Sequence, residues 1–276
     1  MQIDAHQHFW HPARGDHDWM PQGHPILDRP YGPADLAPLL ARHGIDCSVI
    51  VQAAATVEET NYMLGLADAT PSVAGVVGWI DFENPSHRVY LERLAAHPKF
   101  LGVRPMIQDI PDTDWMLSDD IAWAYDALSD LDLTFDALGF PRHLANFATI
   151  MARHPKLKVV IDHCMKPQIR DHSEASLAAW SEGMARLADA GAYVKLSGIV
   201  TEANEGWTVE DLRPYVDEVL RLFTPERVMW GSDWPVCMNK GSYSDWREAA
   251  ETLTADLPPD ARAAIFGDTA ARFYGL

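Results

Sequence analysis

Eight short apolar runs, rich in β-branched residues, recur along the chain and alternate with segments that have a helical pattern of apolar positions. The runs cover residues 3–9, 48–52, 76–80, 101–106, 133–138, 159–164, 192–197 and 227–232. This alternation predicts a parallel α/β sheet, and eight strands are the number that closes a (β/α)8 TIM-type barrel. A doubly wound open sheet is the alternative, but no Gly-rich phosphate turn follows the first run. We therefore expect a barrel whose active site lies at the carboxyl ends of its strands.

The segments between these runs predict helices over residues 35–43, 57–70, 85–97, 120–131, 144–154, 173–190 and 209–223. Gly44 and Gly191 stand where helix C-caps would fall. Residues from Pro258 onward predict a closing helix. We expect its amphipathic part, residues 268–274, to pack against the outside of the barrel.

Length and composition predict a single domain over residues 1–276. A chain of this length with 47% hydrophobic residues can bury a full core. No Gly/Ser linker, low-complexity tract or convincing repeat divides it. One barrel is therefore expected to account for the whole chain.

Charge and cysteine content exclude several classes of protein. The formal net charge of -18, without any cluster of Lys and Arg, excludes nucleic acid as a partner. Cys47, Cys164 and Cys237 are far apart and form no C-x-x-C pair, so we predict no disulfide framework and a cytoplasmic location. No secretory leader or membrane-spanning stretch is recognised, so no membrane partner is expected. The sequence leaves the number of subunits open, a homo-oligomer included.

Polar residues gather at the carboxyl ends of the predicted strands. His6 and His8 lie one residue apart on the first run, so a strand would point both side chains the same way. His163 ends the sixth run. Asp233 directly follows the eighth, where it is the candidate general base.

Further polar residues occupy the corresponding places on other strands, namely Gln52, Asp81, Arg104, Asp136, Lys166, Lys195 and Ser197. For Asp136 and Lys195, a salt bridge inside the barrel is an equal alternative to a functional role. Gln52 could instead satisfy a loop carbonyl.

These residues occur in motifs that resemble a known family. The motifs are Ile-Asp-Ala-His-Gln-His-Phe-Trp at residues 3–10, Gly-Val-Arg at 102–104, Asp-His-Cys-x-Lys-Pro at 162–167 and Gly-Ser-Asp-Trp-Pro-Val at 231–236. With the closing segment 266–275, they resemble the sugar-lactone hydrolases of the amidohydrolase superfamily over nearly the whole chain. That branch contains L-fuconolactonase, L-rhamnonolactonase and 2-pyrone-4,6-dicarboxylate lactonase. The resemblance implies an enzyme that hydrolyses a lactone, a cyclic carboxylic ester.

Lactone hydrolysis requires a water made nucleophilic by a base and a carbonyl that is polarised as its oxygen gains charge. Under this resemblance, Asp233 would deprotonate the water and later pass a proton to the leaving ring oxygen. His6, His8 and His163 would stabilise the oxyanion directly or through a divalent ion. Arg104 would add a fixed cation, and a structural ion pair with a barrel carboxylate is its alternative role.

The sequence leaves the metal content open. His6, His8, His163 and Asp233 can bind a single Zn²⁺ or Mn²⁺ with one position free for water, and the same set also works without metal. Many binuclear members of the superfamily use a carboxylated lysine on the fourth strand. Arg104 occupies that strand here and cannot form a carbamate, so a binuclear centre is not expected. No organic cofactor is expected.

The predicted mouth favours an uncharged sugar over a dicarboxylate, because Arg104 is the one arginine well placed to bind a carboxylate. Aromatic and neutral side chains in the loops suit stacking on a sugar and bonding to its hydroxyls. We predict substrate contacts from Gln52, Trp79, Gln108, Lys166 and Trp234. Tryptophans that only pack within loops, and a solvated Lys166, are the structural alternatives. The expected substrate is an L-sugar lactone of the fucono, galactono or rhamnono type.

Two other functions fit part of the pattern. A metal-dependent decarboxylase of the same superfamily has a similar H-x-H, later histidine and final aspartate, but the scarcity of arginines near the pocket argues against a substrate carboxylate. A non-catalytic barrel that binds a sugar acid or a partner protein would be expected to lack the base or a histidine. All four of these residues are present.

Overall fold

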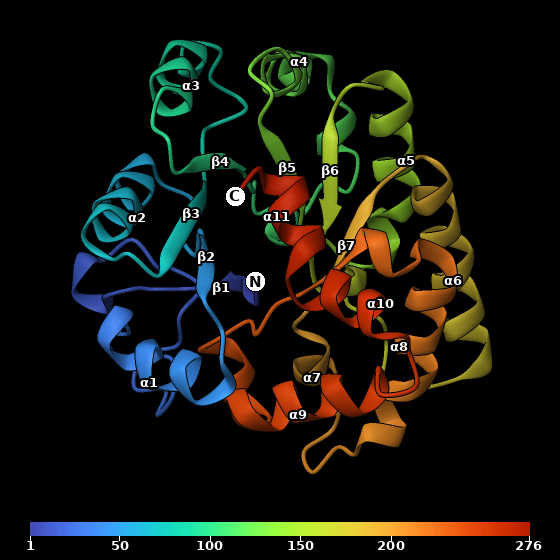
Figure 1. Cartoon of the computed structure of the whole chain (residues 1–276). Coiled ribbons are helices and arrows are strands. Elements are labelled where there is room, and N and C mark those ends of the chain that lie inside the picture. The colour runs from blue at the N-terminus through green and yellow to red at the C-terminus, as the bar shows by residue number, and fades with distance from the viewer.

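Eight parallel strands form one sheet that curls into a barrel, as the alternation of the sequence predicts (Figure 1). The computed structural model describes residues 1–276. The strands are β1 (Ile3–Gln7), β2 (Cys47–Val51), β3 (Val73–Gly78), β4 (Phe100–Val103), β5 (Thr134–Ala137), β6 (Lys158–Ile161), β7 (Tyr193–Leu196) and β8 (Val228–Trp230). They are hydrogen-bonded in sequence order, so the predicted α/β barrel is confirmed.

Most of the helices cover the outside of this barrel. The helices are α1 (Pro33–His43), α2 (Val57–Ala69), α3 (His87–Ala95), α4 (Ala122–Asp130), α5 (Leu144–Arg153), α6 (Glu174–Asp189), α7 (Ile199–Glu202), α8 (Val209–Phe223), α9 (Tyr243–Leu253), α10 (Pro259–Ala263) and α11 (Thr269–Tyr274). The seven predicted inter-strand helices correspond to α1 to α6 and α8. The short α7 and the capped helix α9 were not predicted. None of the helices is both long enough and apolar enough to cross a membrane.

The main core lies between the sheet and the helices. Helix α8 shows the pattern, because Leu212, Val216, Val219 and Phe223 form one buried stripe at spacings of three and four residues. The outward residues of the strands, such as Trp230 on β8, meet these stripes in one large hydrophobic cluster. Burial on this side holds each strand in register and leaves the inward residues free to differ in chemistry.

Backbone contacts just beyond β1 and β8 bring the first and last strands together. The Asp233 amide donates to the His6 carbonyl at 2.8 Å, and the His8 amide donates to the Trp234 carbonyl at 2.7 Å. The Ser232 amide donates to the Asp4 carboxylate at 2.8 Å. These bonds place the polar ends of β1 and β8 side by side.

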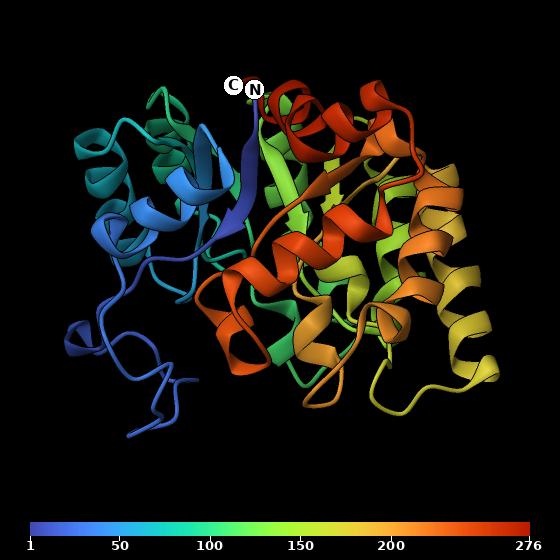
Figure 2. The same cartoon turned by 60° about the horizontal axis from the view of Figure 1, so that its bottom comes forward.

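The end of the chain differs from its expected position. Ala270, Phe273 and Tyr274 of α11 belong to a second hydrophobic cluster with inward residues of the strands, Val51 and Met229 among them. Helix α11 crosses the end of the barrel where both chain termini lie (Figures 1 and 2). The prediction that residues 268–274 pack on the outer wall is therefore wrong. An amphipathic pattern shows that one face is buried, but not which apolar surface buries it.

The carboxyl ends of the strands open at the opposite end from the termini (Figure 2). The loops that follow β1, β4, β6 and β8 gather there and carry the polar residues singled out above.

Candidate active site

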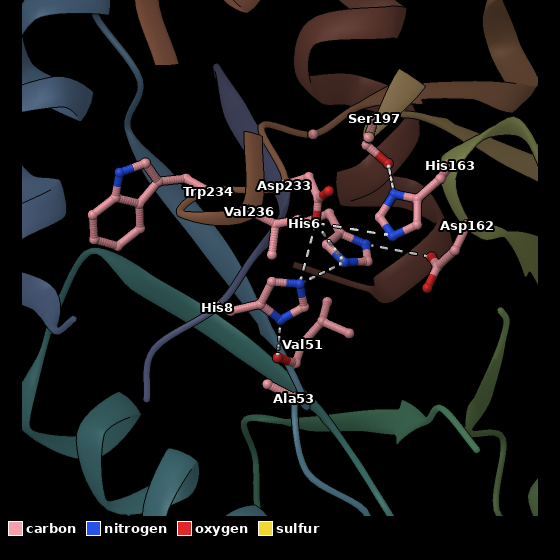
Figure 3. A network of polar contacts seen from close by, with 12 residues as sticks. His6, His8, Val51, Ala53, Asp162, His163, Ser197, Asp233, Trp234 and Val236 are labelled. Carbon is pink, nitrogen blue, oxygen red and sulfur yellow. Dashed lines mark hydrogen bonds and ion pairs between the residues drawn. The ribbon is translucent and has the colours of Figure 1, made fainter. Parts of the chain in front are cut away.

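The two histidines at the end of β1 point into the same space. Their Nε2 atoms lie 3.3 Å apart, and both residues are buried (Figure 3). The pairing of β1 with β2 shifts register between Asp4 and Gln7, an irregularity of the kind that re-aims side chains beside active sites. Nδ1 of His8 lies 2.7 Å from the carbonyl oxygen of Val51. A carbonyl only accepts, so Nδ1 of His8 carries a proton and donates it.

Asp233, just after β8, lies against this pair. Its Oδ1 is 3.2 Å from Nε2 of His8 and 3.9 Å from Nε2 of both His6 and His163. Burial acts to raise the pKa of the Asp233 carboxyl, but the interactions with His163, His8 and His6 outweigh it and hold that pKa below its usual value. The carboxylate is therefore ionised at neutral pH. Asp233 also has φ of 56°, a left-handed conformation that is uncommon for non-glycine residues and is often found at functional sites.

His163 follows β6 in an unusual turn. Residues 163 to 166, from His163 to Lys166, all have φ between 50° and 58°, so four consecutive non-glycine residues are left-handed. Each costs roughly 1–2 kcal/mol relative to a right-handed residue, and such strain concentrates at functional sites. The turn directs Nδ1 of His163 to Oγ of Ser197 at 2.9 Å. Burial lowers the pKa of His163 to about 4, so the ring is neutral at pH 7.

Gly198 provides the space for this ring. A Cβ at position 198 would lie 2.4 Å from Nδ1 of His163, and Gly198 itself has φ of 61°. Both the close approach and the left-handed backbone require glycine at this position.

The cluster fits a divalent metal ion. Nε2 of His6, Nε2 of His8 and Oδ1 of Asp233 all lie within 4.8 Å of one another. Because His8 already donates through Nδ1, its short contact with the ionised Asp233 requires either a second proton on His8 or a shared cation. His6, Asp162 and His163 form a second, overlapping group. Imidazole and carboxylate groups are ligands of catalytic zinc sites, and such sites also have an open position, which the neighbouring cavity provides here.

Arg104, at the end of β4, is held by several buried groups. Its Nη1 lies 3.3 Å from Oδ2 of Asp162 and 3.4 Å from Nε2 of His6, and its Nη2 donates to the carbonyl of Gln52. The side-chain amide of Gln52 donates back to the Arg104 carbonyl at 2.6 Å. The ion pair with a barrel carboxylate is thus present, while Arg104 also lines the cavity described next. Gln52 is buried and holds Arg104 rather than lining that cavity.

A cavity of about 240 Å³ opens over the cluster. It is lined by His8, Trp10, Trp19, Ala53, Arg104, Met106, Gln108, Asp109, Leu138, His163, Lys166, Thr201, Asp233 and Val236. Of the predicted substrate contacts, Gln108 and Lys166 line it and also meet each other at 2.5 Å. His6 lies beneath His8 and is fully buried.

Two tryptophans predicted to contact substrate lie elsewhere. Trp234 points away from the histidines and packs edge-on against Phe9 and Tyr31 (Figure 3). Trp79 lines a neighbouring cavity together with Trp115. Trp79 comes directly after β3, but Trp234 lies four residues beyond the end of β8, so strand alternation does not fix the direction of its ring.

Trp19 lines the cavity although it was not predicted as a site residue. It lies in the loop after β1 and donates its indole N–H to the carbonyl of Ala53 at 2.6 Å. The only signal was the length of that loop, since long loops in compact domains are often functional.

The remaining interior charges pair with each other. Nζ of Lys195 lies 2.5 Å from Oδ2 of Asp136 and 3.1 Å from Oδ1 of Asp162. The salt bridge that was one alternative for Asp136 and Lys195 is therefore present.

Comparison with known proteins adds to this geometry. A family model described as "Amidohydrolase" matches residues 3–276. An L-fucono-1,5-lactonase of Burkholderia ambifaria is 42% identical over 100% of this chain and 96% of the relative. An L-fucono-1,5-lactonase of Burkholderia multivorans is 37% identical over the same shares of the two chains.

The fold agrees with a solved structure. A crystal structure of an amidohydrolase from Burkholderia multivorans with bound zinc matches with a TM-score of 0.94 and 35% identity. The match covers 100% of this chain and 99% of that chain. A relative with the same fold thus binds zinc, in agreement with the ligand types gathered around Asp233.

Proposed function

The chain belongs to the amidohydrolase family, and on this premise we propose that it is a lactone hydrolase that opens an L-sugar lactone to the aldonic acid. The observation that carries the proposal is the buried, ionised Asp233 facing three imidazoles at the floor of the cavity. The L-fucono-1,5-lactonases that match the full chain support a 6-deoxy sugar lactone as the first substrate to test.

Asp233 acts as the general base. Its carboxylate takes a proton from water as the water oxygen bonds to the lactone carbonyl carbon. The bond between that carbon and the ring oxygen then breaks. The proton held by Asp233 passes to the ring oxygen, which becomes a hydroxyl, so the base is regenerated and the acid is released.

His163 and Arg104 act on the carbonyl side. Both line the cavity beside Asp233. Arg104 keeps its charge, and its position is set by Asp162 and Gln52, so it stabilises negative charge on the carbonyl oxygen without reorganising. His163 is neutral at pH 7, and its Nδ1 is bonded to Ser197, so Nε2 is the atom available to the cavity.

His6, His8 and Asp233, with His163 adjacent, would hold a divalent ion of the zinc type. When bound, such an ion supplies Lewis-acid polarisation of the ester carbonyl and lowers the pKa of water. The hydrogen bond from His8 to Val51 orients that ring toward the ion.

Gln108 and Lys166, which line the cavity, are the proposed contacts to sugar hydroxyls. Burial lowers the pKa of the Lys166 ammonium. The guanidinium of Arg104 is engaged by Asp162 and Gln52, so the cavity offers no free arginine fork for a substrate carboxylate. This favours a neutral lactone over a dicarboxylate or a decarboxylation substrate. The volume of about 240 Å³ suits one monosaccharide unit.

Initial hydrolysis rates of L- and D-aldono-1,4- and 1,5-lactones, followed with a pH indicator, test the proposal. We expect rapid turnover of L-fucono-1,5-lactone by the unmodified protein and far slower turnover by Asp233→Asn. Absence of hydrolysis across the panel by folded, zinc-supplied protein would refute the proposal. Three expectations remain predictions: the protein binds no nucleic acid or membrane, it lies in the cytoplasm, and it forms one domain over residues 1–276. Its number of subunits remains open.

A further inference from the structure

A row of buried polar side chains crosses the barrel from the C-terminal helix to the active site. The hydroxyl of Tyr274, on α11, donates to Oδ2 of Asp136 at 2.9 Å. The same oxygen accepts from Nζ of Lys195 at 2.5 Å. Nζ of Lys195 in turn lies 3.1 Å from Nδ1 of His6. The row thus connects the mouth that α11 covers with a histidine at the other mouth.

Lys195 is the central member of this row. An ammonium group has three hydrogens to donate and no lone pair. Nζ has three partners, because besides these two hydrogen bonds it forms an ion pair with Oδ1 of Asp162 at 3.1 Å. Lys195, Asp136 and Asp162 have no exposed surface, so no water competes for these bonds. The position of the ammonium is therefore set by its interactions with Asp136, His6 and Asp162.

His6 is sensitive to where that ammonium lies. Its Nδ1 has a donor, Nζ of Lys195, at 3.1 Å and an acceptor, Oδ1 of Asp162, at 3.4 Å. Donation from Lys195 leaves the ring proton on Nε2, whereas donation to Asp162 leaves a lone pair on Nε2. Nε2 is the atom that faces His8 and Asp233. Nη1 of Arg104, a donor 3.4 Å from Nε2, favours a lone pair on that atom, so donation from Lys195 to Nδ1 opposes Arg104 and donation to Asp162 agrees with it.

We propose that Tyr274 is a positioning residue for His6, acting from the far mouth of the barrel through Asp136 and Lys195. Its hydroxyl supplies part of the hydrogen bonding that Asp136 requires. Without it, Lys195 is the only donor close to Oδ2 of Asp136, so its bond to that oxygen strengthens and its donation to Nδ1 of His6 weakens. The balance at Nδ1 of His6 then changes.

The substitution Tyr274→Phe isolates this effect. It keeps the ring, which packs against Phe273 and lies 5.7 Å from Nζ of Lys195. It also leaves the charges inside the barrel unchanged, because the hydroxyl is neutral. Tyr125→Phe is the matched control, since Tyr125 is equally buried and its hydroxyl donates to a backbone carbonyl, that of Met116, at 3.1 Å. Tyr125 has no contact with the row.

The experiment is nitrogen NMR of the histidine rings in metal-free, full-length protein, with the His6 signals assigned by their loss in His6→Gln. The shifts of Nδ1 and Nε2 report directly which nitrogen carries the proton. We expect Tyr274→Phe to change both His6 shifts and Tyr125→Phe to leave them as in the unmodified protein. Titration with zinc alone should show about tenfold weaker binding in Tyr274→Phe, at the low end for groups that orient metal ligands.

Unchanged His6 shifts and zinc affinity in folded Tyr274→Phe would overturn the proposal. Helix α11 would then only cover the end of the barrel. If Tyr274→Phe does not fold, Asp136→Asn decides, because it weakens the hold on Lys195 from the other side of the same bond and must also shift His6. Turnover is a further readout that rests on the proposed function: kcat should fall and KM stay constant. The NMR and zinc measurements do not depend on the substrate, so failure of the lactonase proposal would not be mistaken for failure of this one.

Discussion

The Nε2 atoms of His6 and His8 lie 3.3 Å apart. His8 donates through its other nitrogen to Val51, and Oδ1 of Asp233 lies 3.2 Å from the same Nε2. Burial, and then the charge of Lys195, lowers the pKa of His6, which keeps that ring neutral at pH 7. Two ring nitrogens and one carboxylate oxygen therefore converge where a cation would satisfy all three.

Removal of metal should abolish most of the activity. We expect a chelator to lower the lactonase rate at least tenfold and zinc or manganese to restore it, because Lewis-acid polarisation is worth several kcal/mol. Metal analysis should find about one ion per chain, lost in His6→Gln and kept in His97→Gln, a partly exposed histidine paired with Asp68. Full activity in protein with less than one tenth of an equivalent of metal would contradict a metal role.

Asp233→Asn should lower kcat by about a thousandfold, within the range for loss of a general base. The amide has nearly the shape of the carboxylate but cannot take the proton from water, so KM should change little. Asp109→Asn is the matched control, since Asp109 lines the same cavity but forms no hydrogen bond or ion pair with the histidines. Initial rates over a range of substrate concentrations would give kcat and KM for both variants. Similar rates for the two variants would remove Asp233 from the mechanism.

Gly198→Ala should lower kcat as well as the free energy of unfolding. The new Cβ would lie 2.4 Å from Nδ1 of His163 and displace that ring from the cavity. Gly191 has φ of 92° with no neighbour within 4 Å, so Gly191→Ala carries the backbone strain alone. Denaturant unfolding should show a loss of about 1–2 kcal/mol in Gly191→Ala and a larger loss in Gly198→Ala, where the contact with His163 adds to the strain. A loss of kcat confined to Gly198→Ala is expected, and equal kcat values would show that His163 is not displaced.

Cys47 should be the only thiol that reacts in the folded protein. Cys164 and Cys237 are buried, and burial raises the pKa of Cys164 to about 12 and holds that of Cys237 well above its usual value. Thiolate is the reactive form, so neither should be alkylated at pH 8. A thiol titration should count one group in native protein and three after denaturation. Rapid reaction of a second thiol would mean that the strand ends open in solution.

Local patterns were sufficient for the strands and for the first histidine pair. Apolar runs with turn signals between them identify strands because each strand buries its outward face against a helix, whatever its neighbours. The alternation along residues 3–9 placed His6 and His8 on the same side, as observed. His163 and Asp233 were found as polar residues at strand ends, where barrel enzymes place their chemistry.

Contacts between distant segments could not be predicted from local sequence patterns. Asp162 and Lys195 meet His6 only because three strands converge in the barrel, and Trp19 reaches the cavity from an irregular loop. The left-handed turn at His163 and the seating of Gly198 beneath it depend on tertiary packing that outweighs local preference.

The sequence by itself therefore determined the eight-stranded barrel and the types of groups at its mouth, because hydrophobic periodicity is a local property. Tertiary structure alone decided which of those groups face the cavity, since a shift of one residue or one turn moves a side chain to another surface. It turned Trp234 outward, and it placed Tyr274 inside the barrel against Asp136 instead of on the outer wall.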